Sequence, residues 1–174
     1  MKKTLHLAMT VIGDHSPALP EQLTKTVSDC GCHIKDCRMT VLGQQLAVLM
    51  LLSGNWDSIA KVEDALLKEK DLAIHIKRTE CDNPGGKLIP YAVDVICPDQ
   101  AGVHSKLMQF FAKNNTHIHD LYSTTYEASQ TATTMVSVHL NIHVPVDIAI
   151  SSLRNDFMDF CDRLNLDAIM EPIK

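Results

Sequence analysis

The sequence lacks the features that mark membrane and secreted proteins. No stretch approaches the roughly 18 uninterrupted apolar residues that a membrane helix needs, and the densest run, residues 46–52, is only as long as a strand. Residues 1–10 mix polar and apolar side chains, whereas a signal peptide requires a continuous apolar core before its cleavage site. We therefore expect a cytoplasmic protein with no membrane contact.

Clusters of basic side chains are also missing. The 174 residues include 16 Lys and Arg against 21 Asp and Glu, a formal net charge of −5, and the basic residues are scattered. Direct DNA binding requires clustered Lys and Arg to neutralise phosphates, and the sequence contains no helix-turn-helix or zinc-finger spacing. If the protein affects gene expression, the sequence predicts that it does so through another protein.

Motifs of the common enzyme and redox classes are absent as well. The sequence has no G-x-S-x-G, H-E-x-x-H, P-loop or G-x-G-x-x-G segment. Its 6 cysteines form no C-x-x-C pair, so reduced thiols are favoured over a disulfide framework. Cys30 and Cys32 flank Gly31, and this segment favours a helix that ends at a left-handed glycine over a redox or metal site.

What the sequence does contain is two periodicities of apolar residues. Alternation predicts strands, and spacing of three and four predicts helices. In the first 80 residues the strands fall at about 5–11, 33–42, 45–52 and 72–76, and the helices at about 19–30 and 55–66. The third strand does not alternate, so we expect it to be central or covered on both faces. Asn55 is a plausible N-cap of the second helix.

The same βαββαβ order then recurs in the second half. Its strands are predicted at about 91–95, 118–125, 133–142 and 166–170, and its helices at about 103–111 and 150–164. His33-Ile34-x-Asp36 and His117-Ile118-x-Asp120 lie at one fixed offset. Repetition at this length indicates the duplication of a whole domain. The predicted division is a first domain at 1–80, a linker at 81–88 and a second domain at 89–174.

This order predicts the α+β fold class, with two tandem ferredoxin-like βαββαβ domains. Each domain packs both helices on one face of an antiparallel sheet. Alternation sends His33 and Ile34 to opposite faces, with Ile34 in the core. Exposed sheet edges are a liability, so we expect side-by-side pairing of the two copies, with an interface near the loop after each first strand.

Those loops and one longer segment resemble a known family. Residues 14–17 (DHSP) and 99–102 (DQAG) each follow a first strand, as in the ACT domain, a module that senses small molecules, usually amino acids. Residues 30–56 and 77–79, with the tandem arrangement, resemble the glycine cleavage system transcriptional repressor family. The resemblance implies a non-enzymatic regulator without a cofactor or DNA-binding domain. It implies binding to a LysR-type activator, relieved by glycine.

The resemblance also implies where an amino acid would bind. The backbone N–H groups and the partial positive charge of a helix N-terminus attract a carboxylate, and a polar side chain at the start of the second strand often completes the pocket. The residues carried over are Asp14, His15, Ser16, Pro17, Ala18, Leu19 and His33 in the first copy, and Asp99, Gln100, Ala101, Gly102, Val103 and His117 in the second. Asp14 or Asp99 would accept from the ammonium group.

The first copy departs from the family pattern because Pro17 stands where glycine is preferred. Proline has no N–H and fixes φ, so the loop with Gly102 ranks higher as a binding site. Pro17 or Pro20 is a candidate first residue of the helix, with Ser16 as a candidate cap.

Three alternatives stay open from the sequence. One is an enzyme with a metal site, whose ligands would come from His33, Asp36, His117, His119 and Asp120. Another is an ACT pair that senses an amino acid but regulates a metabolic enzyme. In the third, the loop aspartates are only helix caps. Further assembly into a homo-oligomer is also open.

Overall fold

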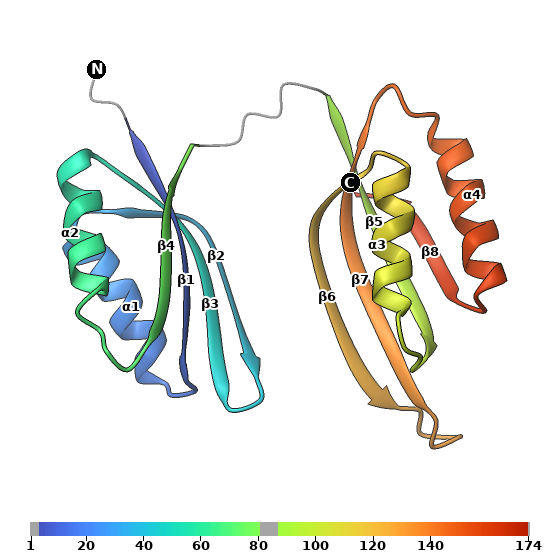
Figure 1. Ribbon diagram of the computed structural model, residues 1–174, viewed down its shortest axis with the longest axis horizontal. Coiled ribbons are helices and arrows are strands. Elements are labelled where there is room, and N and C mark those ends of the chain that lie inside the picture. Colours follow the sequence, from blue (N-terminus) through green and yellow to red (C-terminus); the bar gives the residue numbers. More distant parts are fainter. Residues whose placement is uncertain (1–3, 81–86, 174) are drawn as a thin grey trace. The chain divides into compact units, whose positions relative to one another are not determined.

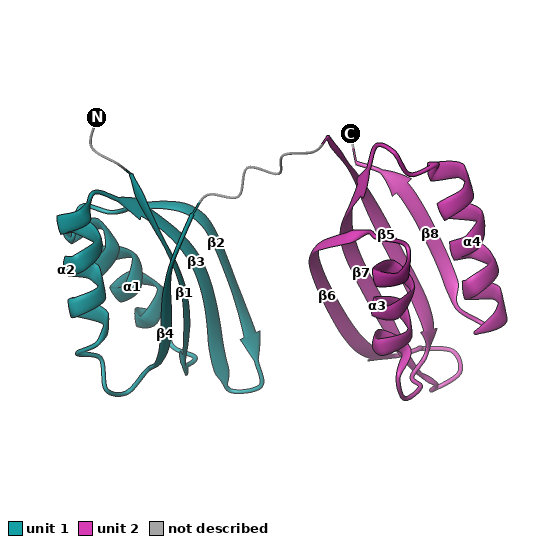
Figure 2. Cartoon of the chain, turned by 45° about the horizontal axis from the view of Figure 1, so that its top comes forward, with its two compact units in different colours: residues 1–83 teal, residues 84–174 magenta. Residues whose placement is uncertain are grey.

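The computed structural model describes residues 4–80 and 87–173. The chain divides into two compact units, Met1–Asn83 and Pro84–Lys174 (Figure 2). Each unit has the order βαββαβ and its own four-stranded antiparallel sheet, so the predicted fold class is confirmed. The predicted linker, 81–88, lies mostly outside the described residues, and pairing of the two copies stays a prediction.

The first unit places both helices on one face of its sheet (Figure 1). Its strands lie in the order β2-β3-β1-β4, so β3 and β1 are central. The elements are β1 (Leu5–Asp14), α1 (Ala18–Asp29), β2 (His33–Leu42), β3 (Gln45–Gly54), α2 (Trp56–Leu66) and β4 (Ala73–Thr79). The buried side chains that face one another across this layer include Leu7, Met9, Val11, Leu23, Val27, Ile59, Val62 and Leu66.

The second unit repeats the arrangement with the order β6-β7-β5-β8. Its elements are β5 (Leu88–Pro98), α3 (Val103–Lys113), β6 (His117–Glu127), β7 (Thr134–Pro145), α4 (Ile150–Arg163) and β8 (Asp167–Pro172). Phe111 and Phe157 are fully buried between α3 and α4, with ring centroids 5.3 Å apart. Full burial of a large apolar side chain contributes about 1.5–3 kcal/mol, so these rings are central to the stability of this unit.

The helix signals read from the sequence are mostly confirmed. The Asn55 side chain accepts a hydrogen bond from the Ser58 backbone N–H at 2.9 Å, as an N-cap does. Gly31 follows the end of α1 with φ at +74°, the left-handed conformation that glycine adopts at low cost.

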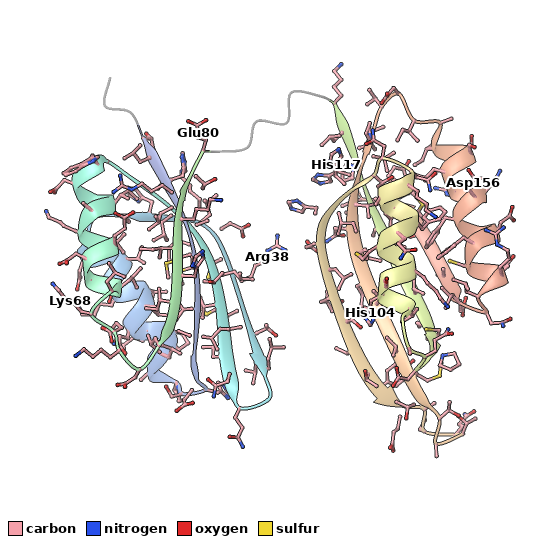
Figure 3. All side chains as sticks on the ribbon, viewed as in Figure 1. Arg38, Lys68, Glu80, His104, His117 and Asp156 are labelled. Atoms are coloured by element: carbon pink, nitrogen blue, oxygen red, sulfur yellow. The ribbon has the colours of Figure 1, made fainter. Side chains whose placement is uncertain are left out.

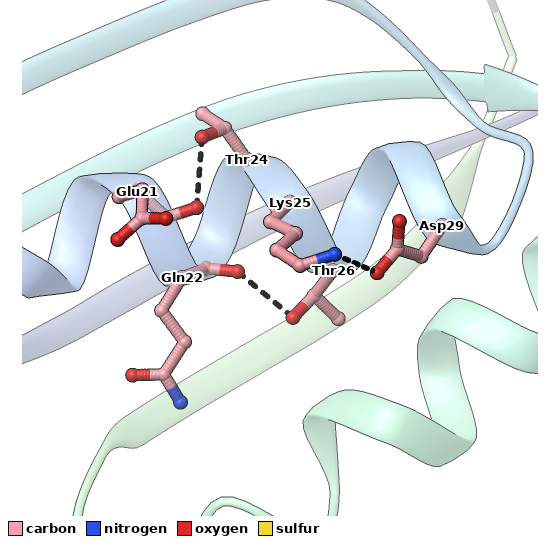
Figure 4. Close-up of polar contacts among 6 residues, drawn as sticks. All are labelled: Glu21, Gln22, Thr24, Lys25, Thr26 and Asp29. Atoms are coloured by element: carbon pink, nitrogen blue, oxygen red, sulfur yellow. Dashed lines mark hydrogen bonds and ion pairs between the residues drawn. The ribbon is translucent and has the colours of Figure 1, made fainter.

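The start of α1 differs from the prediction. The helix begins at Ala18, Pro17 is its N-cap, and no described side chain makes a capping hydrogen bond there. By these bounds neither proline is the first residue of the helix, and Ser16 is not its cap. The backbone of Pro17 nevertheless has helical angles, as suits a proline at a helix start. The exposed side of α1 carries several local polar contacts (Figure 4). The Thr24 and Thr26 hydroxyls donate to backbone carbonyl oxygens one turn earlier, and Lys25 forms an ion pair with Asp29.

Both copies carry an irregularity at the same place in the repeated motif. The pairing of β2 with β3 shifts between Ile34 and Asp36, and that of β6 with β7 shifts between Ile118 and Asp120. The extra residue is a β-bulge, which leaves it unpaired and bends the strand. The repeated His-Ile-x-Asp therefore marks an equivalent structural position in each copy.

One expectation about strand burial needs correction, and one is confirmed. Ile34 pairs with the buried Leu52 on the helix side, but it is 40% exposed because β2 is an edge strand and no helix covers it fully. β3 is central as predicted, yet Leu49 on its other face is 49% exposed. The central position is thus the alternative that the structure bears out, and the helices of this unit lie on the other face from Leu49.

Arg78, in the segment 77–79 that resembles the repressor family, joins β4 to α2. Its guanidinium donates two hydrogen bonds to the Glu63 carboxylate, at 2.9 and 2.7 Å. The hydrogen bonds and charge of Arg78 lower the pKa of Glu63. The stabilisation is therefore present above the ordinary carboxyl pKa and is lost as the pH falls through the lowered value. Because solvent screens a pair this exposed, its contribution to stability is small.

The cysteines differ in exposure, which makes a testable prediction. Burial raises the pKa of the Cys161 thiol to about 12 and raises those of Cys97 and Cys37 as well, but only Cys37 of these three is exposed, on edge strand β2. Because the thiolate is the reactive form, we expect iodoacetamide at pH 8 to label Cys37 first, and Cys161 and Cys97 only after unfolding. Peptide mass spectrometry at timed intervals gives the order, and early labelling of Cys161 would contradict the buried core.

Candidate functional site

The loop between β5 and α3 forms an open helix N-terminus in the second unit. Gly102 is the N-cap of α3, with φ at +83°, and none of the described side chains makes a capping hydrogen bond there. A Cβ built on Gly102 would meet no described atom within 4 Å. No side chain therefore occupies the Gly102 side of the helix start, and a helix N-terminus with free N–H groups and a positive dipole end suits a carboxylate.

Hydrogen bonds fix this loop to the rest of the unit. The Asp99 backbone N–H donates to the Thr134 carbonyl oxygen at 2.9 Å, which ties the loop to the start of β7. Gln100 makes a side-chain hydrogen bond with Cys97, which lowers the pKa of that thiol against the larger raising effect of burial. The Asp99 side chain is exposed, so its carboxylate is available to accept from an ammonium group.

The equivalent loop of the first unit is less suited to a carboxylate. Pro17 and Pro20 lie at the N-cap and in the first turn of α1, and neither has an N–H to offer. The Asp14 carboxylate accepts a hydrogen bond from the Gln45 side chain at 2.8 Å. The His15 N–H donates to the Gln44 carbonyl oxygen at 3.0 Å. Both hydrogen bonds tie this loop to the turn between β2 and β3 and to the first residue of β3.

Two of the predicted site residues belong to the core instead of the surface. Leu19 and Val103 are 5% and 2% exposed. Both are early residues of their helices, and their apolar side chains pack inward to anchor the helix start on the sheet. Only their backbone N–H groups can take part in binding. Ala18 and Ala101 are exposed and small, so they leave space at the surface.

The structure separates the histidines from the loops of their own unit. His33 pairs with Ser53 at one end of β3, while Asp14 pairs with Gln45 at the other end. At about 3.3 Å per residue, roughly 25 Å separate the two positions. One amino acid is too small to contact both within this unit.

The second unit has the same separation. His117 pairs with His143 near the end of β7, whereas the Asp99 loop is bonded to Thr134 at the start of that strand. Figure 3 shows His117 beyond the far end of α3 from His104, which lies next to the loop. The binding role of these residues stays a prediction.

His104 is a neighbour of the loop that the sequence reading missed. It is exposed in the first turn of α3, and its Nε2 lies 2.9 Å from the Ser123 Oγ of β6. The only signal in the sequence was its place directly after the loop motif.

Two histidines of the second sheet stack on one another. His119, at the bulge of β6, lies against His143 with ring centroids 4.6 Å apart. Within residues 4–80 and 87–173, no three His, Cys, Asp or Glu side chains are arranged to hold a metal ion. The same ranges contain no helix long and apolar enough to cross a membrane.

Comparisons with known proteins agree with the geometry. The sequence profile of the ACT domain family matches residues 6–78, which is the first unit. The chain is 29% identical over 163 residues to the glycine cleavage system transcriptional repressor of Escherichia coli (strain K12), covering 92% of this chain and 86% of that protein. The protein of the same name from Shigella flexneri has the same identity and coverage.

Solved structures match the whole chain. A crystal structure of a candidate glycine cleavage system transcriptional repressor has a TM-score of 0.72 at 26% identity and covers 98% of both chains. A protein of unknown function from Galdieria sulphuraria has a TM-score of 0.80 at 18% identity, covering 99% of this chain and 100% of that one, which shows the shared fold.

These findings bear out the resemblance read from the sequence, because the named relatives are transcriptional repressors and the matching family model is the ACT domain. The ACT domain model thus matches residues 6–78, and over 92% of its length the chain is similar to the glycine cleavage system transcriptional repressors.

Proposed function

We propose that the chain is a cytoplasmic, amino-acid-responsive regulator of glycine-cleavage gene expression. It binds glycine, and it acts by binding a LysR-type transcriptional activator without contacting DNA itself. The names of its relatives support the pathway. The net charge of −5 and the scattered basic residues support the use of a protein partner.

The observation that carries the ligand proposal is the open N-terminus of α3. Gly102 leaves the first-turn N–H groups accessible to the glycine carboxylate, and the exposed Asp99 carboxylate accepts from the ammonium group. The loop at Asp14 is the weaker site because Pro17 and Pro20 lack N–H donors. We therefore assign glycine to the second unit.

Regulation follows if glycine and the activator prefer different conformations of the protein. A ligand shifts such an equilibrium only by its difference in affinity between the two states. A ligand as small as glycine makes few contacts, so binding in the millimolar range, about −4 kcal/mol, is consistent with sensing an abundant metabolite.

Isothermal titration calorimetry with glycine tests the site. We expect wild type to bind one glycine per chain in the millimolar range, and Asp99→Asn to weaken binding about twofold to fivefold, as loss of one exposed charge pair would. Asp14→Asn is the matched control, because Asn can still accept from Gln45, and its affinity should equal wild type. No heat in wild type, or equal weakening in both variants, would contradict the assignment.

A further inference from the structure

The sheet of the second unit has one face that its helices do not cover. Alternation and register place Asp94 of β5, Tyr122 of β6, and Ser137 and His139 of β7 on this face. Asp94 and Tyr122 are the direct cross-strand partners of His139 on either side. Ser137 lies two residues before His139 and so points to the same side of the strand.

These side chains form a continuous hydrogen-bonded chain. The Asp94 carboxylate contacts Nδ1 of His139, and Nε2 of His139 lies 3.0 Å from the Ser137 Oγ. A carboxylate only accepts, so Nδ1 carries the proton and Nε2 is left as the acceptor for the Ser137 hydroxyl. The Tyr122 ring stacks on the imidazole, with centroids 4.4 Å apart, and holds it in plane.

We propose that Ser137 is an activated nucleophile and becomes acylated by activated acyl donors, namely aryl esters and thioesters. Oγ attacks the carbonyl carbon while its proton passes to Nε2 of His139, and the Asp94 carboxylate stabilises the imidazolium that forms. The new Oγ–C bond replaces the bond to the leaving group, which departs as a phenolate or thiolate. The proton on His139 then passes to the leaving group or to solvent.

The surroundings of Ser137 limit the reaction to activated donors. Backbone N–H groups in the interior of an antiparallel sheet are used by the ladder, so they do not form an oxyanion hole, whose donors each contribute about 10²–10³ in rate. The cross-strand neighbours are Thr124, whose hydroxyl can donate to the developing oxyanion, and Ile96, an apolar wall. Stoichiometric acylation, not turnover, is the expected outcome.

A second serine–histidine pair in the same unit provides an internal control. Ser123 Oγ lies 2.9 Å from Nε2 of His104, but none of the described carboxylates is hydrogen-bonded to that imidazole. If the orienting carboxylate matters, Ser137 is acylated and Ser123 is not. This comparison is made within one protein sample, so differences in folding do not affect it.

The test uses the full chain and p-nitrophenyl acetate, with peptide mass spectrometry to locate acetyl groups. We expect acetylation of Ser137 to exceed that of Ser123, to disappear in Ser137→Ala, and to slow roughly 100-fold in His139→Gln, within the range for general base catalysis. Asp94 acts through His139 as a positioning residue. Asp94→Asn should slow labelling at least tenfold, and Asp94→Glu, which keeps the carboxylate, should restore most of the rate.

Hydrogen–deuterium exchange of the second unit checks that each variant is folded. The proposal is overturned if Ser137 is labelled no faster than Ser123, if acetyl groups appear only on lysine, cysteine or histidine side chains, or if labelling of Ser137 is unchanged in folded Asp94→Asn and His139→Gln proteins. It does not depend on glycine binding or on the activator.

Discussion

Replacement of Phe157 by Ala is expected to unfold the second unit at a temperature at which the first remains folded. Phe157 is fully buried in α4 and contacts Phe111 and Phe110, with ring centroids 5.3 Å from each. Phe→Ala in a core costs about 3–5 kcal/mol, because the transfer energy is lost and a cavity remains. That is a large part of the 5–15 kcal/mol that typically stabilises a domain.

Hydrogen–deuterium exchange measured separately for the two units provides the readout for Phe157→Ala. For a unit of this size the loss corresponds to a fall in Tm of at least about 12 °C. Phe160→Ala is the matched control, since Phe160 is on the same helix but only half-buried, and it should cost less than half as much. Equal costs for both variants would contradict the described packing.

Gly13→Val is expected to destabilise the first unit by about 3 kcal/mol. Gly13 is buried near the end of β1, and a Cβ there would lie 2.4 Å from Leu72 Cδ2 and 3.1 Å from Leu19 Cδ2. Overpacking of a filled core forces side chains out of their rotamers and typically costs 1–3 kcal/mol. Valine adds two further methyl groups beyond that Cβ, which puts the effect at the upper end.

A second substitution separates this clash from other effects of losing a glycine. Leu72→Ala removes the group that the new side chain meets, so urea unfolding of the double variant should show a favourable coupling of at least about 1 kcal/mol. Gly43→Ala is the control for backbone strain alone, because Gly43 has φ at +64° and no described atom within 4 Å of its Cβ position. If the losses in free energy of unfolding from Gly13→Val and Leu72→Ala simply add in the double variant, the steric explanation is wrong.

The order of elements could be read from the sequence because local patterns and tertiary packing agree. Leu7, Met9 and Val11 alternate in the sequence and are all buried in the structure. The cap at Asn55 could also be predicted, because it bonds to the N–H of Ser58, only three residues later in the sequence. The exposure of Ile34 could not be predicted from the sequence, because it depends on which strand lies at the edge of the sheet.

The candidate site was only partly readable for the same reason. The loop at Asp99–Gly102 is a continuous segment, so its place before a helix follows from the sequence. The distance from this loop to His117 depends on strand direction and register, which place the two at opposite ends of the sheet. The contact of His139 with Asp94 joins two strands far apart in the sequence, and alternation within either strand does not predict it.

Binding of the purified LysR-type activator to the immobilised full chain, with and without glycine, is the most direct test of the regulator proposal. The account predicts a complex without glycine that weakens about tenfold, or 1.4 kcal/mol, at saturating glycine, whereas Asp99→Asn requires proportionally more glycine for the same effect. Failure of the activator to bind, or binding that glycine does not change, would contradict it. Capture of a metabolic enzyme in its place would favour the alternative ACT-pair role.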